Sequence, residues 1–367
     1  MVLDILFYIF LPVVLLQLFY YVIFNNLHST KRDTRAAGVT PVSVIICARN
    51  EEGNLTENLP VLLGQDYEVF EVVVINDGST DGTAAVLEAF SKTAAKLRIL
   101  TVPPSGNATG NKKEALTLGI QAAKYDHLLL TDADCKPAST HWIAGMTAHF
   151  SDKKKIVLGY GAYEKIAGSL LNKLIRYETL LTAVQYMAWA NAGMPYMGVG
   201  RNLAYSRPLL EEQNGFVKHR DIRSGDDDLF INGAGHAENV AVCITKGAFT
   251  ISKAKTNFGD WFKQKRRHIT TAVHYKLIHK ILLALFYISQ FLFWTLAIIL
   301  LAFSFHWWYV TALIAIRWTV QYWTLGIAAK KLDEHDLTPY APLLDFLLVF
   351  TQLRLFFTNL MAKPDRW

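Results

Sequence analysis

The sequence contains few cysteines and few charged residues. Its three cysteines, Cys47, Cys135 and Cys243, lie far apart and form no CxxC pair, which argues against a disulfide framework or a cysteine-based zinc site. Charged residues make up 19% of the chain and hydrophobic residues 52%, a balance too apolar for an ordinary soluble protein. No GxxxxGK motif is present, which excludes a P-loop nucleotide site. There is also no internal repeat and no low-complexity tract.

The surplus of apolar residues is concentrated at the two ends of the chain. The stretch from Leu3 to Phe24 is interrupted only by Asp4 and Gln17, and it is long enough to cross a bilayer. It lacks the basic first region and the small-residue cleavage site of a signal peptide. We therefore expect residues 1–25 to form a retained transmembrane anchor.

Three further apolar stretches lie near the other end, at 281–303, 307–329 and 342–361. The first has no charged residue, the second contains only Arg317, and the third includes Asp345 and Arg354. The first two are expected to be transmembrane helices. The third is predicted to be a re-entrant or interfacial helix, with a fourth transmembrane segment as the alternative.

Lysines and arginines gather beside these stretches and set the expected orientation. They are Lys31, Arg32, Arg35, Lys263, Lys265, Arg266, Arg267, Lys276, Lys280, Lys330 and Lys331. With three spans, all of them fall on one side together with the central domain, and their excess identifies that side as the cytoplasm. A full fourth span would place Lys363 and Arg366 outside. Contacts with anionic lipid headgroups account for the net charge of +6 without a nucleic acid partner.

Between the apolar ends we expect one domain over residues 35–257. Apolar, β-branched runs predict strands at 42–48, 71–75, 97–102 and 127–131. The segments between these strands predict helices at 54–63, 83–96 and 112–124. This alternation predicts an α/β fold, a parallel sheet with helices on both faces. Ligands of such sheets bind beyond the carboxyl ends of the strands, where four acids stand: Glu51, Asp77, Asp132 and Asp134.

The predicted strand at 127–131 is followed by two carboxylates, Asp132 and Asp134. If the strand continues, residues two apart point to the same side. Hard cations such as Mg²⁺ or Mn²⁺ take carboxylate oxygens and leave positions for phosphate oxygens. A solvated turn is the alternative, but the strand before the pair and the acid clusters elsewhere favour a metal site.

The segment from Asp77 to Gly82 ends the second predicted strand and opens a helix. Its glycines permit a tight turn and a close approach of the backbone to a ligand. An ordinary loop in which Asp81 or Thr83 caps the helix is the alternative. Both can hold, with Asp77 on the ligand and Asp81 as the cap.

Three adjacent aspartates, Asp226, Asp227 and Asp228, come directly before an apolar segment that begins at Leu229. This position argues against a simply exposed charge run, which is the alternative. Crowded carboxylates can raise the pKa of one member and so supply a general base.

Residues 258–280 are predicted to form a basic amphipathic helix at the membrane surface. Gln264 and Arg267 lie three residues apart and share a face of that helix. The arginine suits a phosphate oxygen, and the glutamine can hydrogen-bond a hydroxyl group. Contact with lipid headgroups accounts for the remaining cations of the helix.

Taken in order, these motifs resemble the membrane-bound, inverting glycosyltransferases of family 2, which carry a GT-A catalytic domain. The resemblance covers about 35–280 and the membrane segments. The matching segments are 41–52, 76–81, 110–116, 131–134, 198–205 and 224–229. Their common order is far more specific than any one segment.

The resemblance implies a donor site and a metal site. Asp132 and Asp134 would hold the metal and the diphosphate, while Arg49, Glu51 and Asp77 would surround the nucleoside. The residues implied to bind the donor are Arg49, Glu51, Asp77, Lys112, Lys113, Asp132, Gln264 and Arg267.

The resemblance also implies a catalytic base. Aligned on Leu229, the family's base falls on Asp226, but Gly225 replaces the family's glutamate, which leaves Asp227 as an alternative base. The family's QxxRW motif becomes Gln264-x-x-Arg267-His268, so its tryptophan is missing. Because that tryptophan helps to build the acceptor site of processive synthases, its loss argues against a processive enzyme.

We therefore expect a hexosyltransferase that uses a nucleotide-diphosphate sugar, a UDP-sugar, with Mg²⁺ or Mn²⁺. Its acceptor would be a lipid-linked or glycan hydroxyl at a bacterial inner membrane, with the catalytic domain in the cytoplasm. A processive polysaccharide synthase is the first alternative. A membrane nucleotidyltransferase would release pyrophosphate instead of a nucleoside diphosphate. A catalytically silent scaffold would be expected to lack a metal acid or the base, and neither is lost here.

Overall fold

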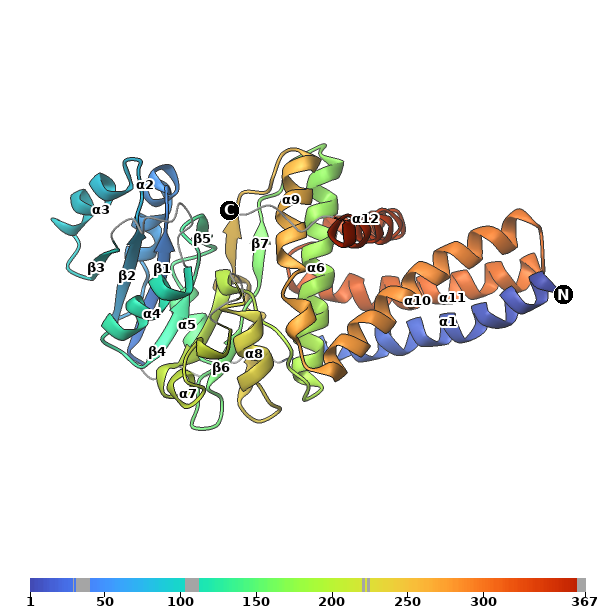
Figure 1. The fold of residues 1–367 in the computed structure, drawn as a ribbon, viewed down its shortest axis with the longest axis horizontal. Helices are drawn as coiled ribbons and strands as arrows, with labels where there is room; N and C mark the ends of the chain where they lie inside the picture. Colours follow the sequence, from blue (N-terminus) through green and yellow to red (C-terminus); the bar gives the residue numbers. More distant parts are fainter. Residues whose placement is uncertain (29, 31–39, 103–111, 220–221, 223–224, 362–367) are drawn as a thin grey trace. The chain divides into compact units, whose positions relative to one another are not determined.

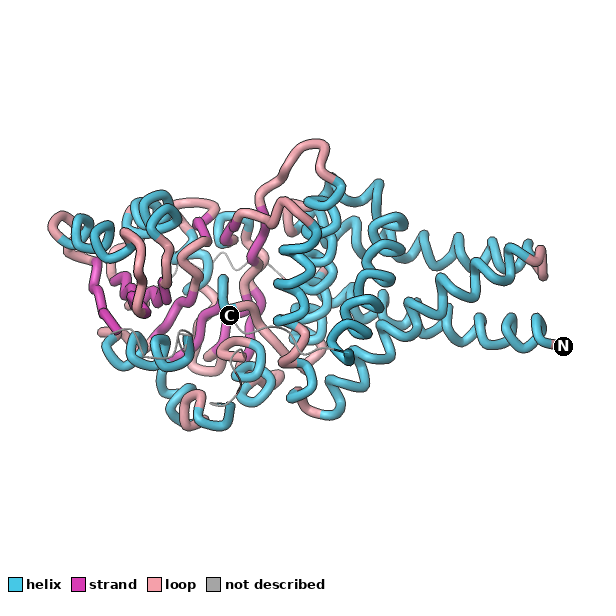
Figure 2. The backbone as a smooth tube through the Cα atoms, turned by 45° about the horizontal axis from the view of Figure 1, so that its top comes forward, coloured by secondary structure: helices cyan, strands magenta, loops and turns pink. Residues whose placement is uncertain are grey.

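A computed structural model describes residues 1–28, 30, 40–102, 112–219, 222 and 225–361. Their elements form two compact units. One, the sheet unit, contains all the strands, and the other, the helical unit, is built from helices (Figure 2). The cationic residues Lys31, Arg32, Arg35, Lys363 and Arg366 lie outside the described part of the chain.

A seven-stranded sheet forms the centre of the sheet unit (Figure 1). Its strand order is β3-β2-β1-β4-β8-β6-β9. The strands are β1 (Val42–Ala48), β2 (Phe70–Asp77), β3 (Leu97–Val102), β4 (His127–Leu130), β6 (Ile156–Leu158), β8 (Leu203–Ser206) and β9 (Val240–Val242). Strands β1 to β4 pair in parallel as predicted, whereas β8 runs antiparallel to both β4 and β6 and makes the sheet mixed. A three-stranded sheet, β5-β10-β7, joins Cys135–Pro137, Thr250–Ser252 and Gly161–Tyr163.

Side chains alternate across β1 and β2, so the two faces of the sheet pack against different helices. On one face, Val44 and Val74 share a core with α2 (Glu52–Leu63), α3 (Thr83–Ser91) and α5 (Trp142–Thr147). On the other face, α4 (Lys112–Ala122) lies so close that a Cβ on Gly119 would come within 2.4 Å of the Ile75 side chain. The predicted helices on both faces are therefore present.

The remaining helices of the sheet unit are short. They are η2 (Gly200–Asn202), α7 (Arg207–Glu212), η3 (Val217–His219), α8 (Asp228–Ala234) and η4 (Lys246–Ala248).

The helical unit contains three helices that run side by side, α1, α10 and α11 (Figure 1). Apolar residues of all three form one core, including Phe10, Phe293 and Val310. The helices of this unit are α1 (Val2–Phe24), η1 (Asn25–Leu27), α6 (Leu170–Asn191), α9 (Phe258–His268), η5 (Ala272–His274), α10 (Leu277–Ala302), α11 (Trp307–Lys331), η6 (His335–Tyr340) and α12 (Ala341–Met361).

Within the described residues, three helical segments are long and apolar enough to cross a membrane. They are Val2–Leu27, Leu277–Ala302 and His335–Met361. Helix α11 forms where a span was expected over 307–329, but it is not among these three. Whether α11 spans the bilayer stays a prediction.

The single helix expected over 258–280 is instead two helices. Helix α9 ends at His268, and α10 begins at Leu277. Two threonines follow α9, and their hydroxyls bond backward to the main chain, Thr270 to the Arg267 carbonyl at 2.7 Å and Thr271 to the His268 carbonyl at 3.1 Å. Such local bonds compete with helix propagation, and they account for the break.

The segment Lys165–Ala192, which contains helix α6, belongs to the helical unit, because its contacts are mainly with the helices near the two ends of the chain. We expected this segment inside the domain at 35–257. Its apolar residues at helical spacing pack against other helices: Tyr177, Leu180 and Val184 are all buried, and α6 contacts α1, α11 and α12.

Candidate functional site

The predicted acids meet at one edge of the large sheet. Because β1, β2 and β4 are parallel, the segments that follow them emerge at the same edge. Glu51 follows β1, Asp77 is the last residue of β2, and Asp132 follows β4. The placement of these acids agrees with the expectation from the sequence.

Hydrogen bonds join the loops after β1 and β2 into one surface. Asn50, which has a left-handed φ of 56°, accepts a hydrogen bond from the Thr80 amide at 2.8 Å. The Glu51 amide donates to the Thr83 hydroxyl at 2.9 Å. Asp81 accepts from the Thr83 amide at 3.0 Å, but the N-cap of α3 is Gly82 and not Asp81 or Thr83 as expected. These bonds leave Asp77 at the end of its strand, half-buried.

The loop after β4 contains the candidate metal centre. Ligand atoms of Asp132, Asp134 and Cys135 all lie within 4.8 Å of one another. The Asn58 amide fixes this loop by donating to the Ala133 carbonyl at 2.9 Å. Asp134 is accessible to solvent, yet enough protein surrounds its carboxyl that desolvation, together with the charge of Asp132, raises its pKa.

A divalent cation fits this pair of carboxylates better than it fits the thiol. Burial raises the pKa of Cys135 well above its ordinary value, with a further contribution from Asp134. A thiol that stays protonated is a poor metal ligand, and hard cations prefer oxygen. The charge of a cation would also relieve the mutual repulsion of Asp132 and Asp134.

Lys112 links this loop to the aspartate cluster on another part of the chain. Its Nζ lies 3.0 Å from Oδ1 of Asp132 and 3.4 Å from Oδ2 of Asp226. Desolvation alone would lower the pKa of Lys112, but the two carboxylates outweigh it and raise that pKa well above its ordinary value. A single ammonium group therefore joins the candidate metal site to the candidate base.

The three adjacent aspartates have different environments. Asp226 is 6% exposed and faces Lys112. Asp227 accepts the Gly200 amide on Oδ2 at 2.6 Å and the Asp228 amide on Oδ1 at 2.7 Å, so it is the N-cap of α8. Asp228 accepts the Leu229 amide at 2.7 Å. Burial and the charges of its two neighbours raise the pKa of Asp227 to about 7.

The other predicted donor-binding residues have surroundings of their own. Lys113 is buried and donates to the Ile222 carbonyl at 2.6 Å, and burial lowers its pKa. Arg49 is exposed on the loop after β1. Gln264 and Arg267 lie on α9, which belongs to the helical unit, so their role toward the donor stays a prediction.

Arg201 is a candidate site residue for which no role was predicted. Its backbone carbonyl accepts from the Thr131 hydroxyl at 3.0 Å, directly before Asp132. Its guanidinium lies 4.4 Å from the Tyr163 ring centre and donates to the Ser252 hydroxyl at 3.0 Å. Its charge acts to lower the pKa of Asp134. Its position in the segment 198–205, one of the segments that resemble the family, could have indicated this residue.

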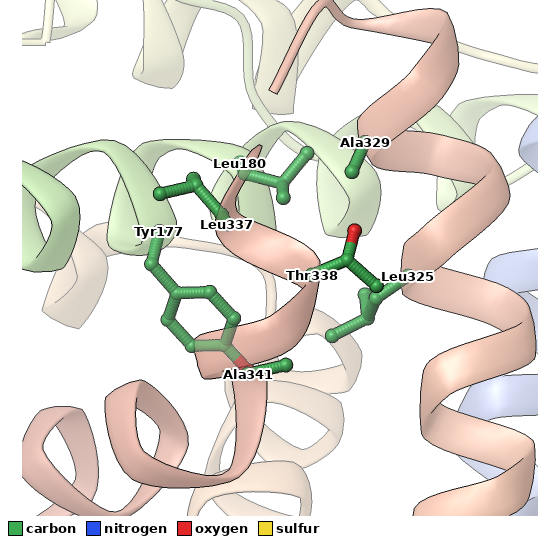
Figure 3. Close-up of a pocket in the computed structure, with 7 residues that line it drawn as sticks. All are labelled: Tyr177, Leu180, Leu325, Ala329, Leu337, Thr338 and Ala341. Atoms are coloured by element: carbon green, nitrogen blue, oxygen red, sulfur yellow. The ribbon is translucent and has the colours of Figure 1, made fainter. Parts of the chain in front are cut away.

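Two cavities elsewhere do not include these residues. One, between α6, α11 and the segment 337–341, measures about 10 Å³ (Figure 3), which is room for about one water. The other, of about 500 Å³, is lined by Asp126 and His127 at the opposite end of β4 from Asp132. Geometry and charge, not cavity size, therefore identify the candidate site.

Comparison with known proteins points to one family. The family model described as glycosyl transferase family 2 matches residues 43–211. An uncharacterized glycosyltransferase of Haemophilus influenzae is 33% identical over 201 residues, which are 52% of this chain and 58% of that protein. The probable glycosyltransferase YdaM of Bacillus subtilis is 26% identical over 239 residues, 62% of this chain and 54% of that protein. The chain thus spans little more than half the length of these relatives.

A solved structure shows the same fold. It is the mannosyltransferase PcManGT from Pyrobaculum calidifontis in complex with GDP-Man and Mn²⁺. The alignment covers 90% of this chain and 99% of that protein, with a TM-score of 0.60 and 20% sequence identity. At that identity the likeness establishes the fold alone.

Proposed function

Because residues 43–211 belong to glycosyltransferase family 2, we propose that the chain transfers a sugar from a nucleoside-diphosphate sugar to an acceptor hydroxyl. The observation that supports this most directly is the Lys112 bridge, which places the Asp132 loop and Asp226 on either side of one cation. A glycosyltransferase needs both a diphosphate site and a base within the reach of one sugar. The donor we propose is a UDP-sugar, and the acceptor is a lipid-linked or glycan hydroxyl.

The proposed reaction is a single displacement with inversion. Asp226 accepts the proton of the acceptor hydroxyl as that oxygen bonds to the anomeric carbon, and the bond from this carbon to the diphosphate oxygen breaks. The nucleoside diphosphate leaves. Asp132 and Asp134 would hold Mg²⁺ or Mn²⁺, which supplies positive charge to the departing diphosphate. Lys112 is placed to contribute a second positive charge at the same point.

Asp226 suits the role of base better than Asp227. Both oxygens of Asp227 accept backbone amides, so Asp227 has less capacity left to bind an acceptor hydroxyl. Asp226 instead faces the ammonium group of Lys112, at 3.4 Å. This difference supports the assignment that the resemblance implied, with Asp227 as a structural cap.

The test is a screen of the purified full chain against several nucleotide sugars, with membrane lipid extract as the acceptor. We expect release of nucleoside diphosphate that depends on added Mg²⁺ or Mn²⁺ and is lost in Asp226→Asn. Release of pyrophosphate would instead identify a nucleotidyltransferase. A ladder of growing products would favour the processive alternative, and no turnover with any donor would favour a silent scaffold.

A further inference from the structure

Two neighbouring lysines open helix α4, and their surroundings differ. Lys113 is 3% exposed and donates to the Ile222 carbonyl at 2.6 Å, so it anchors the start of the helix. The side chain of Lys112 is 42% exposed, and its ammonium group lies 3.0 Å from Asp132 and 3.4 Å from Asp226. In the described part of the chain, the polar partners of Lys112 are thus two carboxylates, and the proposed reaction assigns a role to both.

The contact with Asp132 brings Lys112 into competition with a metal ion. Asp132 is 39% exposed, so a cation from the solvent can reach its carboxylate. A divalent cation and an ammonium group that share one carboxylate repel each other. A cation held by Asp132 and Asp134 would therefore weaken the contact between Lys112 and Asp132.

The contact with Asp226 brings Lys112 into competition with the acceptor. A general base must lie within hydrogen-bonding reach of the hydroxyl whose proton it takes. Asp226 is only 6% exposed, so little of its carboxylate is open to a second partner, and the ammonium group of Lys112 faces its Oδ2. While Lys112 is in this position, it competes with an acceptor hydroxyl for that oxygen.

The side chain of Lys112 is suited to a change of partner. Its ammonium group ends a flexible stem of four carbons, while its backbone is fixed in the first turn of α4, next to the anchored Lys113. Ion pairs of partly exposed lysines are weak. A diphosphate carries more negative charge than one carboxylate and accepts strong hydrogen bonds from an ammonium group. A diphosphate bound through a metal at Asp132 would therefore draw the ammonium group away from Asp226.

We propose that Lys112 exchanges partners during the reaction. It pairs with Asp132 and Asp226 before the metal and the donor bind, and it turns to the donor diphosphate once they are bound. The exchange frees Asp226 to receive the acceptor hydroxyl, so the base becomes available only when the donor is in place. This inference rests on the proposed glycosyl transfer, to which it adds a role for Lys112 before the chemical step.

The first test measures the binding of Mn²⁺ to the solubilised full chain without nucleotide, from the electron paramagnetic resonance signal of free Mn²⁺. Lys112→Gln removes the competing ammonium group and should bind Mn²⁺ more tightly than the wild type, on the order of tenfold. Lys112→Arg retains the charge and should show much less of this gain. Addition of Asp134→Asn to Lys112→Gln should abolish the gain, which assigns the Mn²⁺ to this site. The control is Lys92→Gln, which changes an exposed lysine paired with Glu88 and should match the wild type.

The second test separates an exchange of partners from a defect in folding. Calorimetry with saturating Mn²⁺ measures the affinity for a nucleoside diphosphate, with UDP and GDP as the two probes. Lys112→Gln should bind the nucleotide that the wild type prefers about tenfold more weakly, because a charged hydrogen bond to the diphosphate is lost. The same substitution should thus change the two affinities in opposite directions, whereas a misfolded site would lose both.

The outcomes distinguish the exchange from the proposed transfer. Mn²⁺ binding in Lys112→Gln that is equal to or weaker than in the wild type would overturn the exchange, and so would an unchanged nucleotide affinity. Nucleotide binding by the wild type would leave the proposed transfer intact in both cases. A wild type that binds neither nucleotide would contradict the proposed transfer and, with it, the exchange.

Discussion

Asp226→Asn and Asp227→Asn should separate catalysis from folding. The two residues are adjacent, but Asp226 faces Lys112 and Asp227 accepts two backbone amides. Removal of a general base slows turnover by about 10²–10⁴-fold, which is a barrier increase of about 2.7–5.4 kcal/mol. Asp226→Asn also removes one of three crowded charges, so we expect no loss of stability in this variant.

Asp227→Asn should show the opposite pattern. An asparagine retains one acceptor oxygen, so it can satisfy either the Gly200 amide or the Asp228 amide but not both. The lost hydrogen bond costs about 1 kcal/mol, and we expect a lower unfolding temperature with turnover within about tenfold of the wild type. A tenfold loss of turnover corresponds to an increase of about 1.4 kcal/mol in the activation free energy.

Three measurements on both variants check this pair of expectations. They are turnover by release of nucleoside diphosphate, donor affinity by calorimetry, and thermal unfolding of the detergent-solubilised protein. Donor affinity should be little changed in Asp226→Asn, because a base acts on the acceptor. Full turnover in Asp226→Asn, with loss of turnover and intact folding in Asp227→Asn, would refute the reasoning and move the base one residue along.

Three further expectations concern the metal, pH and the helical unit. Asp134→Asn should abolish transfer and metal-dependent donor binding. The fold should persist, since the substitution relieves the repulsion between positions 132 and 134. Near-wild-type activity of the variant after chelator treatment would contradict a metal role. The pKa of Asp227 is raised to about 7 in the folded state. The proton that Asp227 retains therefore stabilises the fold at low pH, and this contribution is lost as the pH rises through about 7. The unfolding temperature should therefore fall with rising pH more steeply in the wild type than in Asp227→Asn, and equal slopes would exclude this titration. Arg317 and Asp345 form a fully buried ion pair at 2.9 Å. Arg317→Met should destabilise the solubilised protein by about 3–5 kcal/mol, and addition of Asp345→Leu should recover most of the loss; a double variant no better than the single one would show that the pair is not coupled.

Much of the sheet and its acidic edge could be predicted from local sequence. The strands β1 to β4 are apolar runs that end at turn residues, and parallel pairing places the acids after them at one edge whatever the details of packing. The three-aspartate cluster could also be predicted from local sequence, because its charges lie directly before an apolar helix.

Other features depend on distant partners and carried no local signal. The bond of Asp227 to the Gly200 amide joins positions 27 residues apart, and the Lys112 bridge depends on where the chain returns to the sheet. Helix α6 has the apolar periodicity of any core helix, and nothing in that pattern says which unit it packs with. The threonines that end α9 gave a local signal, but the amphipathic pattern over 258–280 outweighed it.

Because α6 groups with the terminal helices, the described part of the chain passes between the two units four times, near residues 30, 165, 193 and 255. Trimming both ends would therefore not yield a soluble protein, since a fragment of residues 30–254 keeps α6. That fragment would expose Tyr177, Leu180 and Val184, which the removed helices normally cover, and we expect it to aggregate. A soluble version requires excision of Lys165–Ala192 as well, with a short linker that rejoins β7 to the segment before β8. For the intact chain, the same four connections mean that proteolysis at a single site would leave both units tethered.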